Sequence, residues 1–226
     1  MSDQGQPGRH GDETEAGRAR PDGDEGLLET VVSILTRPVP TLRGLTARPR
    51  VGWAIAVTLF IGVLTWVAAA ARFGTSPPGV GGLPPEFREL RGVFMVGAVV
   101  FGPIFGLIGL ALGAGILHGV SLLLRGEGSY SGLFTGLAFA NVPSALTVIT
   151  QLLPLSLGMG GALLAGLTNF ALAAWVVVLG VLAVRENNRF STGRAIAVVL
   201  IPAGILIGLF ILLMILLFAA FFAAGS

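Results

Sequence analysis

Residues 51–71 read VGWAIAVTLFIGVLTWVAAAA, a run without any charged residue between Arg50 and Arg72. An α-helix rises about 1.5 Å per residue, so this run covers roughly 30 Å, the thickness of one hydrocarbon core. Trp53 and Trp66 lie near its two ends, where aromatic side chains anchor helices at membrane surfaces. The run is therefore predicted to be a membrane-spanning helix.

Three more uncharged stretches follow this span, at residues 92–124, 128–184 and 195–226. The first exceeds one upright span, and Gly102-Pro103 predicts a kink in it. The second is long enough for two spans, with a break expected at residues 158–161, GMGG. The sequence thus predicts an all-α, polytopic transmembrane helical bundle of about five spans.

The arginines are distributed unevenly between the two sides of this bundle. Placing the N-terminus in the cytoplasm puts these arginines inside: Arg37, Arg43, Arg48, Arg50, Arg125, Arg185, Arg189 and Arg194. Only Arg72, Arg88 and Arg91 then fall outside. The positive-inside rule therefore favours an N-in, C-out topology. The chain contains arginine but no lysine, which is typical of GC-rich prokaryotic genomes, and a prokaryotic cell membrane is the expected location.

Two segments precede the five-span domain, which is expected over residues 51–222. Residues 1–25 are acidic and rich in glycine, with no large apolar residue after Met1, so they are predicted to be a disordered cytosolic tail. Residues 26–50 form an amphipathic juxtamembrane segment too short to span. This segment either lies among the lipid headgroups, with its arginines facing anionic lipid, or packs on the protein's own loops.

The composition argues against several classes of function. The net charge is only +2 and no long Lys/Arg run exists, so we expect no nucleic-acid binding. Asp, Glu, Lys and Arg are absent from the predicted spans, although proton pumps and intramembrane aspartyl proteases depend on such groups. His118 and Ser121 share a helix face, but no orienting carboxylate accompanies them. We therefore expect no catalytic, cofactor or metal site, and no enzymatic activity.

Several polar, helix-bending and small residues inside the spans are candidates for contacts between the helices. His118, Asn141, Pro143, Gln151 and Pro202 are the candidate polar or kink positions, with interhelical hydrogen bonding as the default role of the polar ones. A strip of small residues, Gly102, Gly106, Gly109 and Gly113, predicts a close helix contact within the chain, with a dimer face as the alternative. The alternative function is a small-molecule or lipid transporter with a polar cavity around Asn141, Gln151 and Asn169.

Four short blocks of the sequence are informative together: PTLR at residues 40–43, LRGEGSY at 124–130, GLAFANVP at 136–143 and VRENNRFSTGRA at 184–195. Together they resemble the Yip family of five-span membrane proteins. The resemblance covers about residues 27–220. The tail lacks the Asp-Leu-Tyr-Gly-Pro-type motif of the eukaryotic branch, which makes this chain similar to the prokaryotic branch.

The resemblance implies a non-enzymatic scaffold in membrane organisation or trafficking, in contact with the lipid bilayer. Eukaryotic relatives are named for binding Ypt/Rab GTPases, so the resemblance also implies a cytosolic protein partner. Arg125, Arg185, Glu186 and Arg194 are the candidate interaction residues, because these charges lie closest to the cytosolic helix ends. Setting the topology is the alternative role of these arginines.

Overall fold

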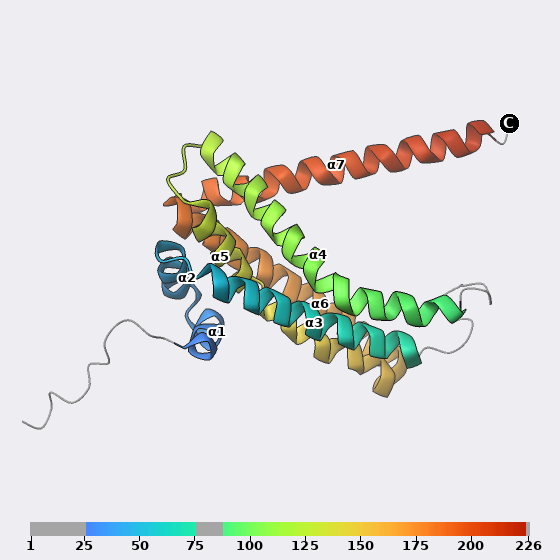
Figure 1. The fold of residues 1–226 in the computed structure, drawn as a ribbon. Coiled ribbons are helices and arrows are strands. Elements are labelled where there is room, and N and C mark those ends of the chain that lie inside the picture. The colour runs from blue at the N-terminus through green and yellow to red at the C-terminus, as the bar shows by residue number, and fades with distance from the viewer. Residues whose placement is uncertain (1–25, 76–87, 225–226) are drawn as a thin grey trace, which may run out of the picture.

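The computed structural model describes residues 26–75 and 88–224 (Figure 1). These residues form helices and short connections, without a strand. The elements are α1 (Leu27–Thr36), α2 (Pro38–Ala47), α3 (Val51–Thr75), α4 (Arg88–Leu123), α5 (Tyr130–Ala140), the 3₁₀ helix η2 (Val142–Leu146), α6 (Thr147–Asn188) and α7 (Thr192–Ala224). The all-α prediction is confirmed, and the predicted tail at residues 1–25 lies outside the described residues.

Five stretches of the described helices are long and apolar enough to cross a membrane. They are Val51–Ala71, Gly92–Leu123, Tyr130–Gln151, Leu157–Asn188 and Thr192–Ala219. The first has the bounds expected from its flanking arginines. The third combines α5, η2 and the start of α6, which shows that a span need not be one uninterrupted helix.

The predicted break between the third and fourth spans lies at Gly158, within α6. Its backbone dihedral angles, φ 54° and ψ −132°, are not helical. Glycine has no Cβ and adopts such a conformation readily, whereas other residues are strained there. Gly158 therefore divides α6 into a first arm that completes the third span and a second arm that forms the fourth.

Helix α5 occupies the centre of the bundle. Three buried apolar clusters each include α5 residues: Phe139 packs with residues of α1, α2, α3 and α6, Leu133 with residues of α6 and α7, and Phe134 with residues of α3 and α4. Small residues allow these close approaches; Ala138 and Ala140 of α5 are buried as well. The core is thus organised around one short helix.

Helices α3 and α4 lie side by side along much of their length (Figure 1). A Cβ added at Gly102 of α4 would clash with the Trp66 indole of α3, and one at Gly62 of α3 would lie 3.0 Å from Pro103. Pro103 lies inside α4, which changes direction part-way along its length (Figure 1). The close contact thus depends on glycine at position 102, whereas a methyl group at position 62 requires Pro103 to move by a few tenths of an ångström.

Helix α7 leaves the bundle after its first turns. Ala195 and Val198 are buried against α5 and α6, but large apolar residues from Leu200 to Phe222 are exposed. Figure 1 shows the far part of α7 diverging from the other helices. A soluble protein would not expose so many apolar side chains, and a lipid environment accounts for them.

Candidate functional site

A polar cavity of about 800 Å³ lies where α2, the 127–129 turn, the end of α6 and the start of α7 meet. Its lining residues are Arg43, Thr46, Ala47, Glu127, Gly128, Ser129, Arg185, Glu186, Asn187, Arg189, Phe190, Ser191 and Thr192. We call this end of the bundle, together with the nearby Arg125 and Arg194, the arginine end. The cavity is formed by segments that are distant in sequence.

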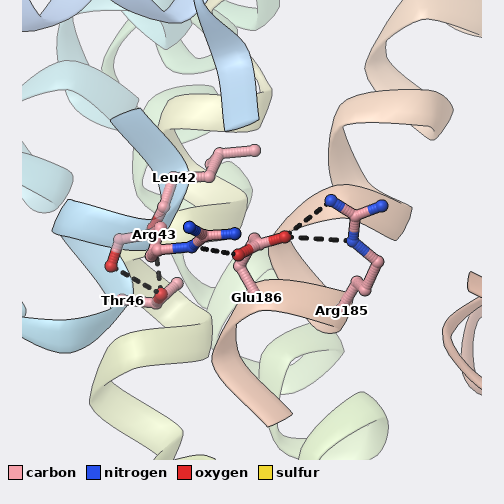
Figure 2. A network of polar contacts seen from close by, with 5 residues as sticks. All are labelled: Leu42, Arg43, Thr46, Arg185 and Glu186. Atoms are coloured by element: carbon pink, nitrogen blue, oxygen red, sulfur yellow. Dashed lines mark hydrogen bonds and ion pairs between the residues drawn. The ribbon is translucent and has the colours of Figure 1, made fainter. Parts of the chain in front are cut away.

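Glu186 is at the centre of an ion network in the cavity wall (Figure 2). Arg43 donates from Nε to Glu186 Oε2 at 2.8 Å. Arg185 donates to Glu186 Oε1 from Nη2 at 2.7 Å and from Nε at 3.0 Å. The Glu186 side chain is only 8% exposed, and two guanidinium groups offset the cost of removing its charge from water.

The ion network joins α2 to α6. Arg43 is 143 positions away from Glu186 in the chain, so this bond fixes the segment before the first span onto the end of the fourth. Thr46, one turn after Arg43, donates to the Leu42 carbonyl at 2.9 Å, within the same helix (Figure 2). Leu42 is itself fully buried in the cluster around Phe139, which holds α2 in place from its apolar side.

Two asparagines at the end of α6 hold the turn between α4 and α5. Asn187 donates from Nδ2 to the Ser129 carbonyl at 3.1 Å. The Gly128 amide donates to Asn188 Oδ1 at 3.3 Å. A Cβ at Gly128 would clash with the Asn187 side chain, so the turn can approach this closely only with glycine. Ser129 caps α5 by accepting the Gly132 amide at 3.1 Å.

Helix α6 ends with a left-handed residue that turns the chain into α7. Arg189 has φ 53°, and the Phe190 amide donates to the Arg185 carbonyl at 3.1 Å. This geometry places the Phe190 ring in the buried cluster with Leu133 and Val184. The Arg189 side chain, in contrast, is exposed and lies 3.7 Å from Glu127 at the cavity rim.

Residues 32–224 match the Yip1 domain. The chain belongs to the Yip1 domain family. With its five apolar helices, it is an integral membrane protein of that family. No curated protein and no solved structure matches the chain.

Three of the four sequence blocks that carried the Yip resemblance meet at the cavity. PTLR supplies Arg43, LRGEGSY supplies Glu127, Gly128 and Ser129, and VRENNRFSTGRA supplies Arg185 to Asn187 and Arg189 to Thr192. The fourth block, GLAFANVP, runs through the buried end of α5 into η2. In this member of the Yip1 domain family, the family-like segments therefore converge on the arginine end.

The four predicted interaction residues divide between the cavity and the surface. Arg185 and Glu186 line the cavity, whereas Arg125 and Arg194 are exposed and do not line it. Arg43 and Arg189 line it, although sequence reasoning did not select them. The PTLR block was a signal for Arg43, but its pairing with α6 could not be read from spacing.

The predicted glycine strip on α4 has two different environments. Gly102 is buried against Trp66. A Cβ at Gly106, Gly109 or Gly113 would have no atom of the described chain within 4 Å, apart from its own helix backbone and chain neighbours. Close packing at these three glycines, as expected from the sequence, stays a prediction.

His118 and Ser121 are not hydrogen-bonded to each other. Ser121 is fully buried, and neither its Oγ nor His118 Nδ1 has a hydrogen-bond partner among the described residues. The His118 ring packs edge-on against Tyr130, with 6.2 Å between ring centroids. Tyr130 in turn donates to the Ala111 carbonyl at 3.1 Å, so this group links α4 to the start of α5.

The remaining polar and kink candidates lie along the third, fourth and fifth spans. Pro143 is buried in η2, Pro202 is half-buried inside α7, and Asn141 is exposed at the end of α5. Gln151 is half-buried, and Thr150 next to it donates to Asn169 Oδ1 at 2.6 Å across the two arms of α6. None of these residues lines the cavity at the arginine end.

Proposed function

We propose that this Yip1 domain protein is a non-enzymatic membrane scaffold whose arginine end faces the cytoplasm and docks a protein partner. The observation that carries the proposal is the polar cavity at this end, built around the Arg43–Glu186–Arg185 network. Its size, about 800 Å³, is enough for several side chains of a partner. The excess of arginine at this end agrees with a cytoplasmic orientation.

The charges favour an acidic partner surface. Three arginines and two glutamates line the cavity, and Arg125 and Arg194 add exposed positive charge beside it. Glu186 offsets part of the charge of Arg43 and Arg185, while Arg189 and Arg43 remain largely exposed, with side chains 84% and 69% accessible. Carboxylates of a partner can therefore pair with arginines that are already positioned.

The test is site-specific photocrosslinking in cells that express the full chain. A photoreactive residue replaces Thr192 at the cavity rim, and a matched probe replaces Phe210 on the exposed part of α7. The expected result is a defined protein adduct from position 192 that position 210 does not give. Mass spectrometry of the adduct identifies the partner.

Charge reversal then tests the chemistry. Arg194→Glu is expected to reduce the adduct at position 192 several-fold, because Arg194 is exposed and the change leaves the Glu186 network intact. Arg48→Glu is the control, because Arg48 is also exposed and outside the cavity lining but follows α2, whereas Arg194 lies two positions after the probe at Thr192. An absence of any protein adduct at position 192, or an adduct indifferent to Arg194, would contradict docking at this end.

A further inference from the structure

Helix α1 has an exposed apolar edge that no other part of the described chain covers. Leu28, Val32 and Leu35 are 79%, 60% and 41% exposed. At 100° per residue, these three side chains fall within an arc of about 60°. They form a narrow stripe along a helix of 10 residues, which we call the α1 stripe.

The stripe is not the face by which α1 packs on the bundle. Ile34 is fully buried in the cluster that includes Phe139 and Val142, and Leu27 and Val31 pack against this cluster. These residues occupy the arc next to the stripe, so the apolar surface of α1 continues from its packed face to its exposed edge. Beyond the stripe the surface becomes polar, with Glu29 and Thr36 exposed.

The packing partners of α1 place it at acyl-chain depth. Val57, in the same cluster as Ile34, lies six residues after Val51, where the first span begins. Six residues correspond to about 9 Å along the helix. Half the hydrocarbon core is about 15 Å thick. With the core beginning at Val51, this cluster extends from Trp53, near the surface, to Val57, about 9 Å into the leaflet at the arginine end.

Two further features fix the surface level near the start of α3. The Arg50 guanidinium lies 4.4 Å from the centroid of the Trp53 ring, a pair suited to the headgroup region. Arg37, exposed at the end of α1, has a side chain long enough to reach phosphates from below. The polar edge of α1 can thus face water and headgroups while its stripe faces lipid.

We infer that α1 is inserted sideways into the leaflet at the arginine end, with Leu28, Val32 and Leu35 in contact with lipid acyl chains. The occupant of the stripe is lipid because α1 lies beside helices that are themselves in the bilayer at that depth. Both interpretations of residues 26–50 drawn from the sequence are thereby combined: one face packs on the protein, and the next one meets the membrane. This inference concerns residues outside the cavity and does not rest on the docking proposal.

Depth-resolved quenching in phospholipid nanodiscs tests the inference on the full chain. The protein contains no cysteine, so single cysteines at Leu28, Val32 and Leu35 can carry a nitrobenzoxadiazole fluorophore. Glu29 and Thr36, exposed on the polar edge of the same helix, are matched controls. The nanodiscs contain phosphatidylcholine and phosphatidylglycerol, with or without a nitroxide on a shallow acyl-chain carbon.

The probes on the α1 stripe are expected to be quenched by the acyl nitroxide and shielded from aqueous iodide. The probes at Glu29 and Thr36 are expected to be quenched by iodide and to be less quenched by the acyl nitroxide. Iodide access at Leu28, Val32 and Leu35 equal to that at Glu29 would overturn the inference. Shielding of the stripe from both quenchers would also overturn it, because a second copy or another protein would then cover the stripe. Neither result would affect crosslinking at position 192, so failure here is distinguishable from failure of the docking proposal.

Discussion

The third and fifth spans differ in what surrounds them. In an 18-residue stretch of the span Tyr130–Gln151, 56% of the residues are buried within the protein, whereas in the corresponding stretch of Thr192–Ala219 the figure is 6%. Both spans are uncharged apart from Arg194 near the start of the fifth. In the third span, α5 contacts α1, α2, α3, α4 and α6, whereas the buried residues by which the fifth span joins a core cluster, Ala195 and Val198, lie in its first turns.

The difference shows that apolar residues in this chain have two kinds of surroundings. Around α5 they meet protein side chains, where volume and shape decide stability. Along α7 they meet lipid, which is as apolar as they are and adapts to their shape. Substitutions of the same kind should therefore have large effects in the third span and small ones in the fifth.

The largest effect is expected from removing an aromatic ring in the core. Phe139→Ala leaves a cavity among α1, α2, α3 and α6, because Phe139 is fully buried. We expect a loss of about 3–5 kcal/mol in the free energy of unfolding, measured by SDS titration in mixed micelles. Phe210→Ala, at a side chain 61% exposed on α7, should cost much less. Equal losses for the two variants would remove the distinction between the spans.

A glycine pair provides the next comparison. A Cβ at Gly132 of α5 would clash with the Asn187 side chain and lie 2.7 Å from the Thr46 carbonyl oxygen. Gly132→Ala should therefore destabilise the protein by about 1–3 kcal/mol, as overpacking does. Gly208→Ala on α7, where a Cβ has open space, is expected to be neutral in the same SDS titration. A neutral Gly132→Ala would show that α2 and α6 can move away from α5.

The ion network predicts an intermediate effect. Glu186→Gln removes the charge that Arg43 and Arg185 share, and should lower the free energy of unfolding by about 1–3 kcal/mol. Glu127→Gln is the control, since Glu127 is 74% exposed and 3.7 Å from Arg189, and exposed pairs contribute about 0–1 kcal/mol. If Glu186→Gln and Glu127→Gln lower the free energy of unfolding equally, the ion network does not hold α2 on α6.

The smallest effect concerns a hydrogen bond inside the membrane. Thr150→Val removes the 2.6 Å bond from Thr150 to Asn169 that joins the two arms of α6. Interhelical bonds of this kind contribute about 0.6 kcal/mol on average, so the unfolding midpoint should move slightly downward. Thr58→Val is the matched control, because Thr58 donates only to Ala54 of its own helix. A decrease of more than about 2 kcal/mol in the free energy of unfolding would mean that Asn169 finds no other hydrogen-bond partner in the Thr150→Val variant.

Most of the fold could be predicted from the residues, but only part of the site. The break at Gly158 and the bounds of the first span follow from local chemistry. Arg185 and Glu186 were selected by their position at a helix end, and both line the cavity. Arg43 was missed as a site residue because its partner is 143 positions away, and no local pattern connects two such distant segments.

The sequence by itself determined which stretches of the chain can cross the bilayer, because about 20 consecutive uncharged, apolar residues are most stable as a helix in lipid. Only the tertiary structure decided which apolar faces pack on protein and which meet lipid, as the contrast of α5 with α7 and the two faces of α1 show. The physical reason is that lipid and a protein core are equally apolar, so hydrophobicity cannot distinguish them. The shape of the packing surfaces does distinguish a protein core from lipid. Complementary surfaces form only where Gly132, Ala138 and their neighbours allow the helices to approach each other.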